Sequence, residues 1–124
     1  MSLRDLMLKP VAVPQQEVPV PELGCTVHVY GMTGGQKSRF ELSLQTNGKK
    51  SNRKMQTFRE RLMIQCCRDE TGAPIFQDSD IEALSDMPAK IVERIVDVAM
   101  DLSGMNGADL EELVGNSEDS QNDS

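Results

Sequence analysis

Apolar and polar side chains alternate near the N-terminus and follow a helical period further along the chain. Residues 25–30 alternate and are rich in β-branched side chains, which predicts a strand. Val18 and Val20 are placed to pair beside it across a turn at residues 22–24. Because proline lacks a backbone N–H, the Pro-rich segment 10–24 is predicted to be extended chain or an edge strand.

Helical spacing follows this hairpin. Thr33 is a predicted N-cap for a short helix that carries Phe40 and Leu44 and ends near Asn47. A polar loop over residues 45–54 comes next. A second helix, ending before Gly72, then presents one apolar stripe of Met55, Phe58, Leu62 and Cys66.

The C-terminal half predicts a short helix and then a long one. Asp78 is the expected cap of the short helix, whose inner face holds Ile81 and Leu84. For the long helix, Asp86 is the expected cap, Pro88 lies in the first turn, and Gly104 ends it. Its predicted buried stripe is Met87, Ile91, Ile95, Val98 and Leu102. A last short helix is expected around Leu110 and Leu113.

These elements predict an α+β fold, a mostly helical single domain with a small N-terminal β-hairpin and a disordered C-terminal tail. The Pro-rich segment 1–24 leads into the hairpin, and residues 25–114 form the domain. Residues 115–124 carry no basic or apolar side chain apart from glycine, so we expect this acidic tail to be disordered.

Charge is divided unevenly along the chain, whose 124 residues carry a net charge of -7. Residues 37–68 hold nine basic and two acidic side chains, whereas the chain from Asp69 onward holds fifteen acidic and two basic ones. The acidic total argues against a protein whose whole surface binds nucleic acid or an anionic membrane. No apolar run approaches the length of a membrane helix or a signal peptide, so we expect a cytoplasmic protein.

A basic cluster lies within the polar loop and is formed by Lys49, Lys50, Arg53 and Lys54. One hypothesis is attraction to the acidic part of a neighbouring copy in a homo-oligomer. A merely solvated loop is an equally good interpretation. The alternative function is a small nucleic-acid-binding regulator that uses the basic segment 49–61, although this segment lacks the interleaved aromatic side chains of single-strand binders.

Candidate catalytic and metal-binding residues are few. His28, the single histidine, lies mid-strand and is interpreted as structural. Cys66 and Cys67 are adjacent on a helix, so at most one is expected to face the core. The acidic stretch 69–80 lacks the spacing of a calcium loop. We therefore predict no catalytic, cofactor-binding or metal-binding residue, and a protein that is not an enzyme.

Methionine is abundant, with eight in the chain. Methionine fills irregular cores, and it also forms adaptable binding surfaces. Core packing is the main alternative to a partner-binding groove here. If a groove exists, its expected lining is Met87, Ile91, Met100 and Met105.

Two stretches are informative together with the helix that follows them. They are residues 20–34 (VPELGCTVHVYGMTG) and 64–84 (IQCCRDETGAPIFQDSDIEAL), and the long helix ends in Leu-Ser-Gly-Met at 102–105. In these features the chain resembles tail assembly chaperones of long-tailed bacteriophages and prophages. The resemblance extends from about residue 3 to residue 114 and consists of hydrophobic positions and turns. It implies a non-enzymatic factor in the cytoplasm of the bacterial host that is absent from the mature virion. Its implied partners are the tape measure protein, which it would keep soluble, and the tail tube protein, which it would help to recruit. In this family a longer form often arises by a translational frameshift near the C-terminus, and the tail after Gly115 is where it would join.

Overall fold

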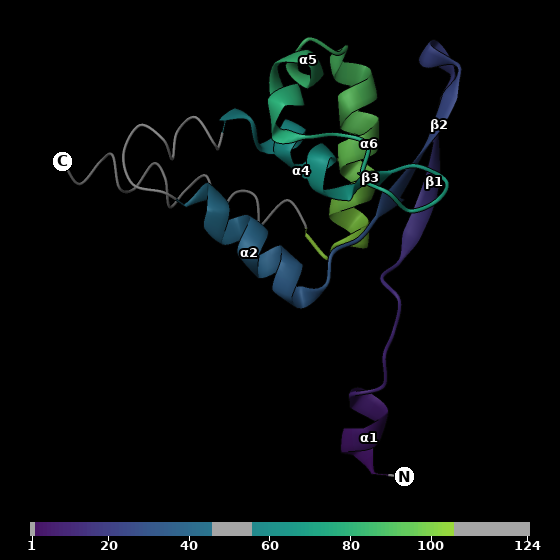
Figure 1. Cartoon of the computed structure of the whole chain (residues 1–124), viewed down its shortest axis with the longest axis vertical. Helices are drawn as coiled ribbons and strands as arrows, with labels where there is room; N and C mark the ends of the chain where they lie inside the picture. The colour runs from purple at the N-terminus through teal and green to yellow at the C-terminus, as the bar shows by residue number, and fades with distance from the viewer. Residues whose placement is uncertain (1, 46–55, 106–124) are drawn as a thin grey trace, which may run out of the picture.

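The computed structural model describes residues 2–45 and 56–105, in which a small antiparallel sheet packs against helices (Figure 1). Strands β1 (Gln15–Val20) and β2 (Cys25–Tyr30) form the predicted hairpin, with Val18 opposite Val27 and Val20 opposite Cys25. A short 3₁₀ turn, η1 (Pro21–Leu23), joins them, and Gly24 closes it at φ 66°, a conformation that favours glycine. The expected edge strand is confirmed, because the strand order is β1-β2-β3.

The third strand, β3 (Cys67–Arg68), was not predicted. It is two residues long and pairs antiparallel with β2, with His28 opposite Arg68 and Val29 opposite Cys67. No alternating pattern marks so short a strand. Tertiary pairing with β2 therefore defines it.

One face of the sheet forms part of the hydrophobic core. Val18, Val20, Val29 and Cys67 are buried on this face, whereas the residues between them on each strand are exposed or half-buried. This alternation is the two-residue period of a strand. The same core contains Leu44, Leu62 and Leu84 from the helices.

The helix α2 (Gly34–Leu44) begins at Thr33 as predicted. Thr33 Oγ1 accepts from the Gln36 N–H (3.1 Å), and Gln36 Oε1 accepts from the Thr33 N–H (2.9 Å), which completes a capping box. Phe40 and Leu44 are buried, as expected, and the Phe40 ring meets the edge of Phe58 at a centroid distance of 5.8 Å. This contact joins α2 to α4 (Phe58–Cys66).

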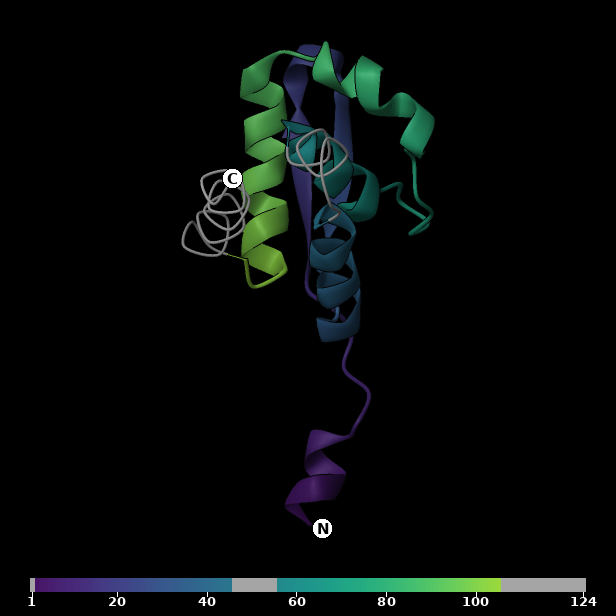
Figure 2. The same ribbon diagram turned by 90° about the vertical axis from the view of Figure 1, so that its left-hand side faces the viewer.

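The long helix α6 (Ala89–Leu102) lies between α4 and the hairpin (Figure 1). Ile91 and Ile95 are buried as predicted, while Met87, Val98 and Leu102 are partly buried against the core. Val92, Val96 and Ala99 are buried as well, so the covered face is wider than the predicted stripe. Turned by 90°, the view shows the short helix α5 (Ile81–Ser85) joined to the start of α6 by a short link, at the same end of the molecule as the hairpin turn (Figure 2).

Both predicted aspartate caps in this region are wrong. Asp78 begins a 3₁₀ turn, η2 (Asp78–Asp80), and it is the Asp80 carboxylate that reaches back to accept from the Gln77 N–H (2.8 Å). Asp86 ends α5, where its N–H donates to the carbonyl of Glu82 (3.1 Å). The helix α6 begins after Pro88 and has no side-chain cap.

Four expectations lie outside the described residues. These are Met55 in the apolar stripe of the second helix, the loop with the basic cluster Lys49, Lys50, Arg53 and Lys54, the helix around Leu110 and Leu113, and the acidic tail.

Candidate partner-binding surface

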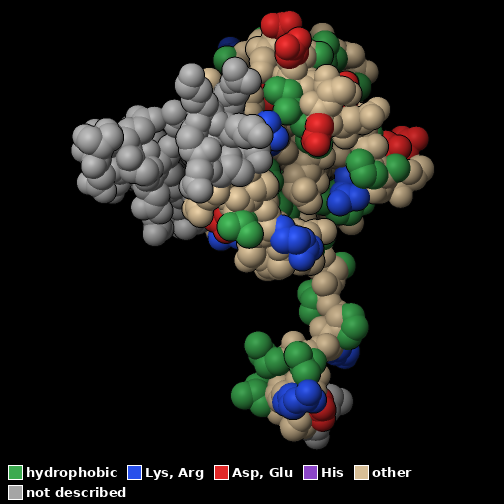
Figure 3. Space-filling view, turned by 60° about the vertical axis from the view of Figure 1, so that its left-hand side comes forward, with side chains coloured by type: hydrophobic (Ala, Val, Ile, Leu, Met, Phe, Trp, Pro, Cys, Tyr) green, Lys and Arg blue, Asp and Glu red, His purple; other side chains and the backbone are tan. Residues whose placement is uncertain are grey.

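The N-terminal arm, residues 2–14, carries a concentration of exposed apolar side chains. Its helix α1 (Leu3–Met7) begins at Ser2, whose Oγ accepts from the Asp5 N–H at 3.1 Å. No residue of α1 is buried, and Leu3 and Met7 are 74% and 75% exposed. Figure 3 shows these side chains gathered at the end of the arm, apart from the body. α1 therefore presents an apolar surface that the other described residues leave uncovered.

The linker between α1 and β1 holds the helix away from the body. Pro10 and Pro14 fix their own φ angles and restrict Lys9 and Val13 to extended conformations. Both views show the arm leaving the body with α1 at its far end (Figures 1 and 2). Val11 in this linker is exposed as well. Apart from the half-buried Val13, the apolar side chains of the arm are therefore exposed.

The predicted groove residues of α6 lie mostly inside the molecule. Ile91 is 2% exposed and Met105 is 4% exposed, and both belong to the core. Met87 and Met100 are partly buried against it. In this conformation Ile91 and Met105 offer no surface to a partner, while Met87 and Met100 keep part of theirs. Contact of these four residues with a partner stays a prediction.

The solvent-facing side of α6 is acidic. Glu93, Asp97 and Asp101 are exposed and lie four residues apart, which places them along one side of the helix. Arg94, on the hairpin side, donates from Nη1 and Nη2 to the two carboxylate oxygens of Glu22 at 2.9 and 2.7 Å. These hydrogen bonds from the guanidinium lower the pKa of Glu22 to about 2. The ion pair fastens the hairpin turn to α6.

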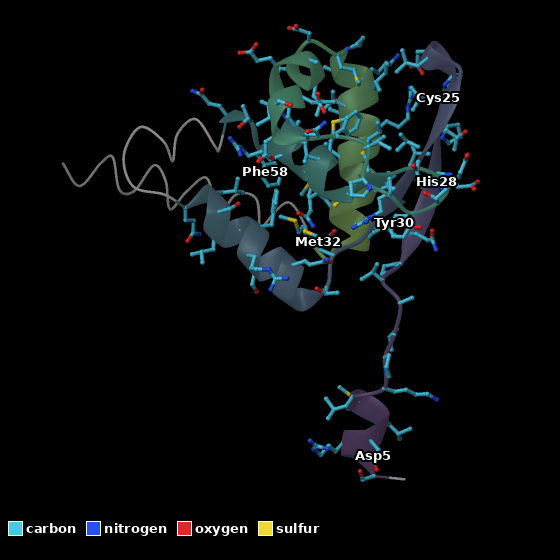
Figure 4. The ribbon with its side chains drawn as sticks, viewed as in Figure 1. Asp5, Cys25, His28, Tyr30, Met32 and Phe58 are labelled. Atoms are coloured by element: carbon cyan, nitrogen blue, oxygen red, sulfur yellow. The ribbon has the colours of Figure 1, made fainter. Side chains whose placement is uncertain are left out.

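The outer face of the sheet carries polar and aromatic side chains. His28 and Tyr30 lie on β2 (Figure 4), and His28 Nδ1 is 3.9 Å from Glu17 Oε1 on β1. The Arg68 guanidinium lies over the Tyr30 ring, 5.1 Å from its centroid, and donates from Nη1 to the carbonyl of Gly72 at 3.1 Å. His28 is half-buried, as predicted for a structural histidine.

The cysteines are arranged differently from the expectation. Cys66 and Cys67 are both buried, because α4 ends at Cys66 and the extended backbone of Cys67 turns its side chain into the core from β3. Burial raises the pKa of Cys66 to about 11 and that of Cys67 to about 12. Both thiols are therefore protonated at neutral pH and are poor nucleophiles. Cys25 is exposed at the start of β2 (Figure 4).

The acidic turn after β3 uses its carboxylate internally. Asp69 Oδ1 accepts from the N–H of Thr71 (2.8 Å), the hydroxyl of Thr71 (2.6 Å) and the N–H of Ala73 (3.1 Å). These hydrogen bonds lower the pKa of Asp69. Residues 69–73 thus form a turn closed by hydrogen bonds. Across residues 2–45 and 56–105, no three His, Cys, Asp or Glu side chains are grouped to hold a metal ion.

Sequence reasoning missed the exposed apolar helix α1. Leu3, Leu6 and Met7 follow the i, i+3, i+4 spacing of an amphipathic turn after a serine cap. The prolines that follow separate this turn from any core. Together these two signals were sufficient to identify it.

No helix within the described part of the chain has both the length and the apolar character needed to cross a membrane.

Comparisons with known proteins agree with this architecture. The model of the phage tail assembly chaperone family matches residues 2–121. The fold is similar to the structure of the bacteriophage HK97 tail assembly chaperone, with a TM-score of 0.55 and 20% sequence identity over 81% of this chain and 91% of that one. None of the curated protein sequences compared with the chain matches it. Because the family model covers almost the whole sequence, the chain belongs to the phage tail assembly chaperone family.

Proposed function

We propose that this protein binds the tape measure protein of its phage, keeps that chain soluble and helps to recruit tail tube subunits during tail assembly. It acts as a homo-oligomer in the cytoplasm of the bacterial host and is absent from the mature virion. The protein binds and releases its client without catalysing a chemical reaction. Family membership supports the assembly role, and the arm supports the mode of binding.

The observation that carries the proposal is an exposed apolar arm attached to an acidic body. A tape measure segment with an amphipathic helix exposes an apolar face that drives aggregation until another surface covers it. Leu3, Leu6 and Met7 provide such a surface, with Leu8 beside them. The net charge of -7 opposes self-aggregation of the resulting complex.

The residues expected from the sequence take different places in this proposal. Met87 and Met100 extend the apolar contact with the client, since both keep part of their side chains exposed. Ile91 and Met105 support them from the core. Lys49, Lys50, Arg53 and Lys54 attract the acidic part of a neighbouring copy.

Co-expression with a tape measure fragment tests the proposal. We expect the wild-type protein to raise the soluble yield of the fragment and to co-purify with it. The triple variant Leu3→Ser, Leu6→Ser and Met7→Ser should lose both effects. Leu42→Ser is the matched control, because Leu42 is similarly exposed (68%) but lies on α2. An unchanged yield with the wild-type protein, or equal loss with the control, contradicts the proposal.

A further inference from the structure

The outer edge of β1 has free backbone hydrogen-bonding groups. Within the described residues β1 ends the sheet on this side. The Gly31 N–H donates to the Pro14 carbonyl at 2.8 Å, so the even-numbered residues 14–20 direct their backbone groups toward β2. The odd-numbered residues Gln15, Glu17 and Pro19 then direct theirs to the open edge. Pro19 has no N–H to offer there, so the edge ends as a pairing surface at this residue.

The linker continues this edge toward the N-terminus. Lys9 and Val13 precede prolines and are restricted to extended conformations. If the same alternation continues, Lys9, Val11 and Val13 direct their N–H groups to the open edge. Pro10 and Pro14 lie on the other side of the strand, so neither removes a donor from it. In the structure β1 begins at Gln15 and Lys9 lies at the bend that follows α1, so pairing with another chain would extend this edge from residue 15 back to residue 9.

We propose that two copies of this chain pair along residues 9–17, antiparallel and centred on Val13, to form a continuous sheet across a two-fold axis. This pairing rests on the proposed function and would form the homo-oligomer named there. It is tested with the purified protein alone, whereas client binding is tested by co-expression, so failure of either is distinguishable from failure of the other.

Charge complementarity favours a second copy of this chain as the partner, and it favours the pairing centred on Val13. Centring on Val13 places Lys9 of each copy opposite Glu17 of the other, with Cα atoms about 5.5 Å apart. The Glu17 side chain is 72% exposed and Lys9 is exposed too, so both are accessible. Centring on Glu17 would place two carboxylates opposite each other, which is destabilising. Centring on Gln15 would bring Pro19 into the ladder, where a donor is missing.

The same register accounts for two exposed apolar surfaces. When Lys9 lies opposite the partner's Glu17, α1 continues past the end of the paired segment, beside the hairpin turn of the other copy. That turn contains Leu23, which is 59% exposed. Each end of the joint sheet then combines α1 of one copy with the turn of the other. The client-binding surface is complete only in the pair.

Two proline variants test the edge. Val13→Pro removes the central outward donor, and Ala12→Pro, one residue away, alters a position that faces the other side. We expect Val13→Pro to halve the mass of the assembly in light scattering and Ala12→Pro to leave it unchanged, with both variants retaining the melting temperature of the wild type. A monomeric wild-type protein overturns the proposal, as does a Val13→Pro variant of unchanged mass. If the wild-type protein is a monomer and the Val13→Pro variant no longer binds the tape measure fragment, the proposal is also overturned. The occupant of this edge is then an extended segment of the client.

Charge reversal tests the register. Lys9→Glu and Glu17→Lys should each dissociate the pair, whereas mixing the two variants should restore it, because both cross-copy pairs are then opposite in charge. Failure of the mixture to associate refutes the Val13-centred register.

Cysteine substitution tests the two-fold centre in a Cys25→Ser background. Val13→Cys should form a disulfide between copies, since residue 13 lies opposite itself at a distance that a disulfide can span. Val11→Cys, which lies opposite residue 15, should not. Equal cross-linking of both variants refutes the register.

Discussion

At the scale of single residues, Gly31 and Ser103 determine how closely β2 and α6 approach. A Cβ atom at Gly31 would collide with the backbone carbonyl of Leu102. The buried hydroxyl of Ser103 accepts from the Met32 N–H at 3.2 Å and also contacts the Cys66 thiol. Residues about seventy positions apart are thus in backbone contact, and only glycine fits at this point.

Gly31→Ala should destabilise the protein. The added methyl group must displace backbone atoms, and overpacking of this kind costs roughly 1–3 kcal/mol of the free energy of unfolding. Gly34→Ala is the control, because a Cβ there meets no atom within 4 Å. Urea denaturation followed by circular dichroism measures both variants. Equal midpoints for the two would show that β2 and α6 are not packed this closely.

The Glu22–Arg94 ion pair makes stability depend on pH. The pKa of Glu22 falls from 4.5 to about 2 in the folded state, so the pair stabilises the fold fully above pH 4.5. This contribution is lost as the pH falls toward 2. Glu22→Gln should therefore lower the melting temperature at neutral pH, and the difference from wild type should vanish near pH 2.

The control for this experiment is Glu82→Gln. Glu82 is exposed and makes no ion pair with any described residue. Its substitution should leave the melting temperature at neutral pH unchanged. A gap between Glu22→Gln and the wild type that stays constant from neutral pH to pH 2 would contradict the role of Glu22.

At the scale of elements, the hairpin, α2 and α6 follow from the sequence because each carries its own local signal. Val18 and Val20 occupy alternate positions of β1, Thr33 caps α2, and Ile91 and Ile95 mark the inner side of α6. The rest depends on tertiary contacts. β3 exists through its pairing with β2, and this pairing buries Cys67, which helical spacing alone would have directed elsewhere.

The candidate site was less predictable than the fold. Methionine content drew attention to Met100 and Met105, but an apolar helix face has the same sequence pattern whether its own core or a partner covers it. The structure shows that α4 and the sheet cover most of this face on α6. By contrast, the apolar spacing in α1 indicates a surface for a partner, because the prolines that follow α1 hold this helix away from the core of its own chain.

The capping box should contribute measurably to α2. Thr33→Ala removes the hydroxyl that accepts from the Gln36 N–H and should cost about 1 kcal/mol of the free energy of unfolding. Thr33→Ser keeps the hydroxyl and should retain most of the stability. Ser38→Ala, at an exposed position of the same helix, is the control and should be neutral or slightly stabilising. A Thr33→Ala variant as stable as Ser38→Ala would contradict the cap.

At the scale of the whole molecule, a folded body is separated from an arm that adds nothing to its core. The core comprises the inner face of the sheet together with α2, α4, α5 and α6. Every residue of α1 is exposed. The hydrophobic core and the exposed apolar helix α1 therefore belong to different parts of the chain.

Deletion of residues 2–8 tests this separation. Because α1 has no buried residue, the deletion should change the free energy of unfolding by less than about 0.5 kcal/mol. The same variant should lose the tape measure fragment in co-expression. Hydrogen exchange of the core amides, unchanged by the deletion, is the supporting measurement. A large drop in stability would mean that the arm packs on its own body.

The contact of α6 with the hairpin also has a consequence for when the protein folds. Arg94 reaches the hairpin turn, and Leu102 and Ser103 reach the end of β2, so α6 closes a core that begins at β1. A ribosome-bound chain that stops before α6 lacks these contacts, and contacts between distant residues form slowly. Folding therefore waits until residue 105 has left the ribosome.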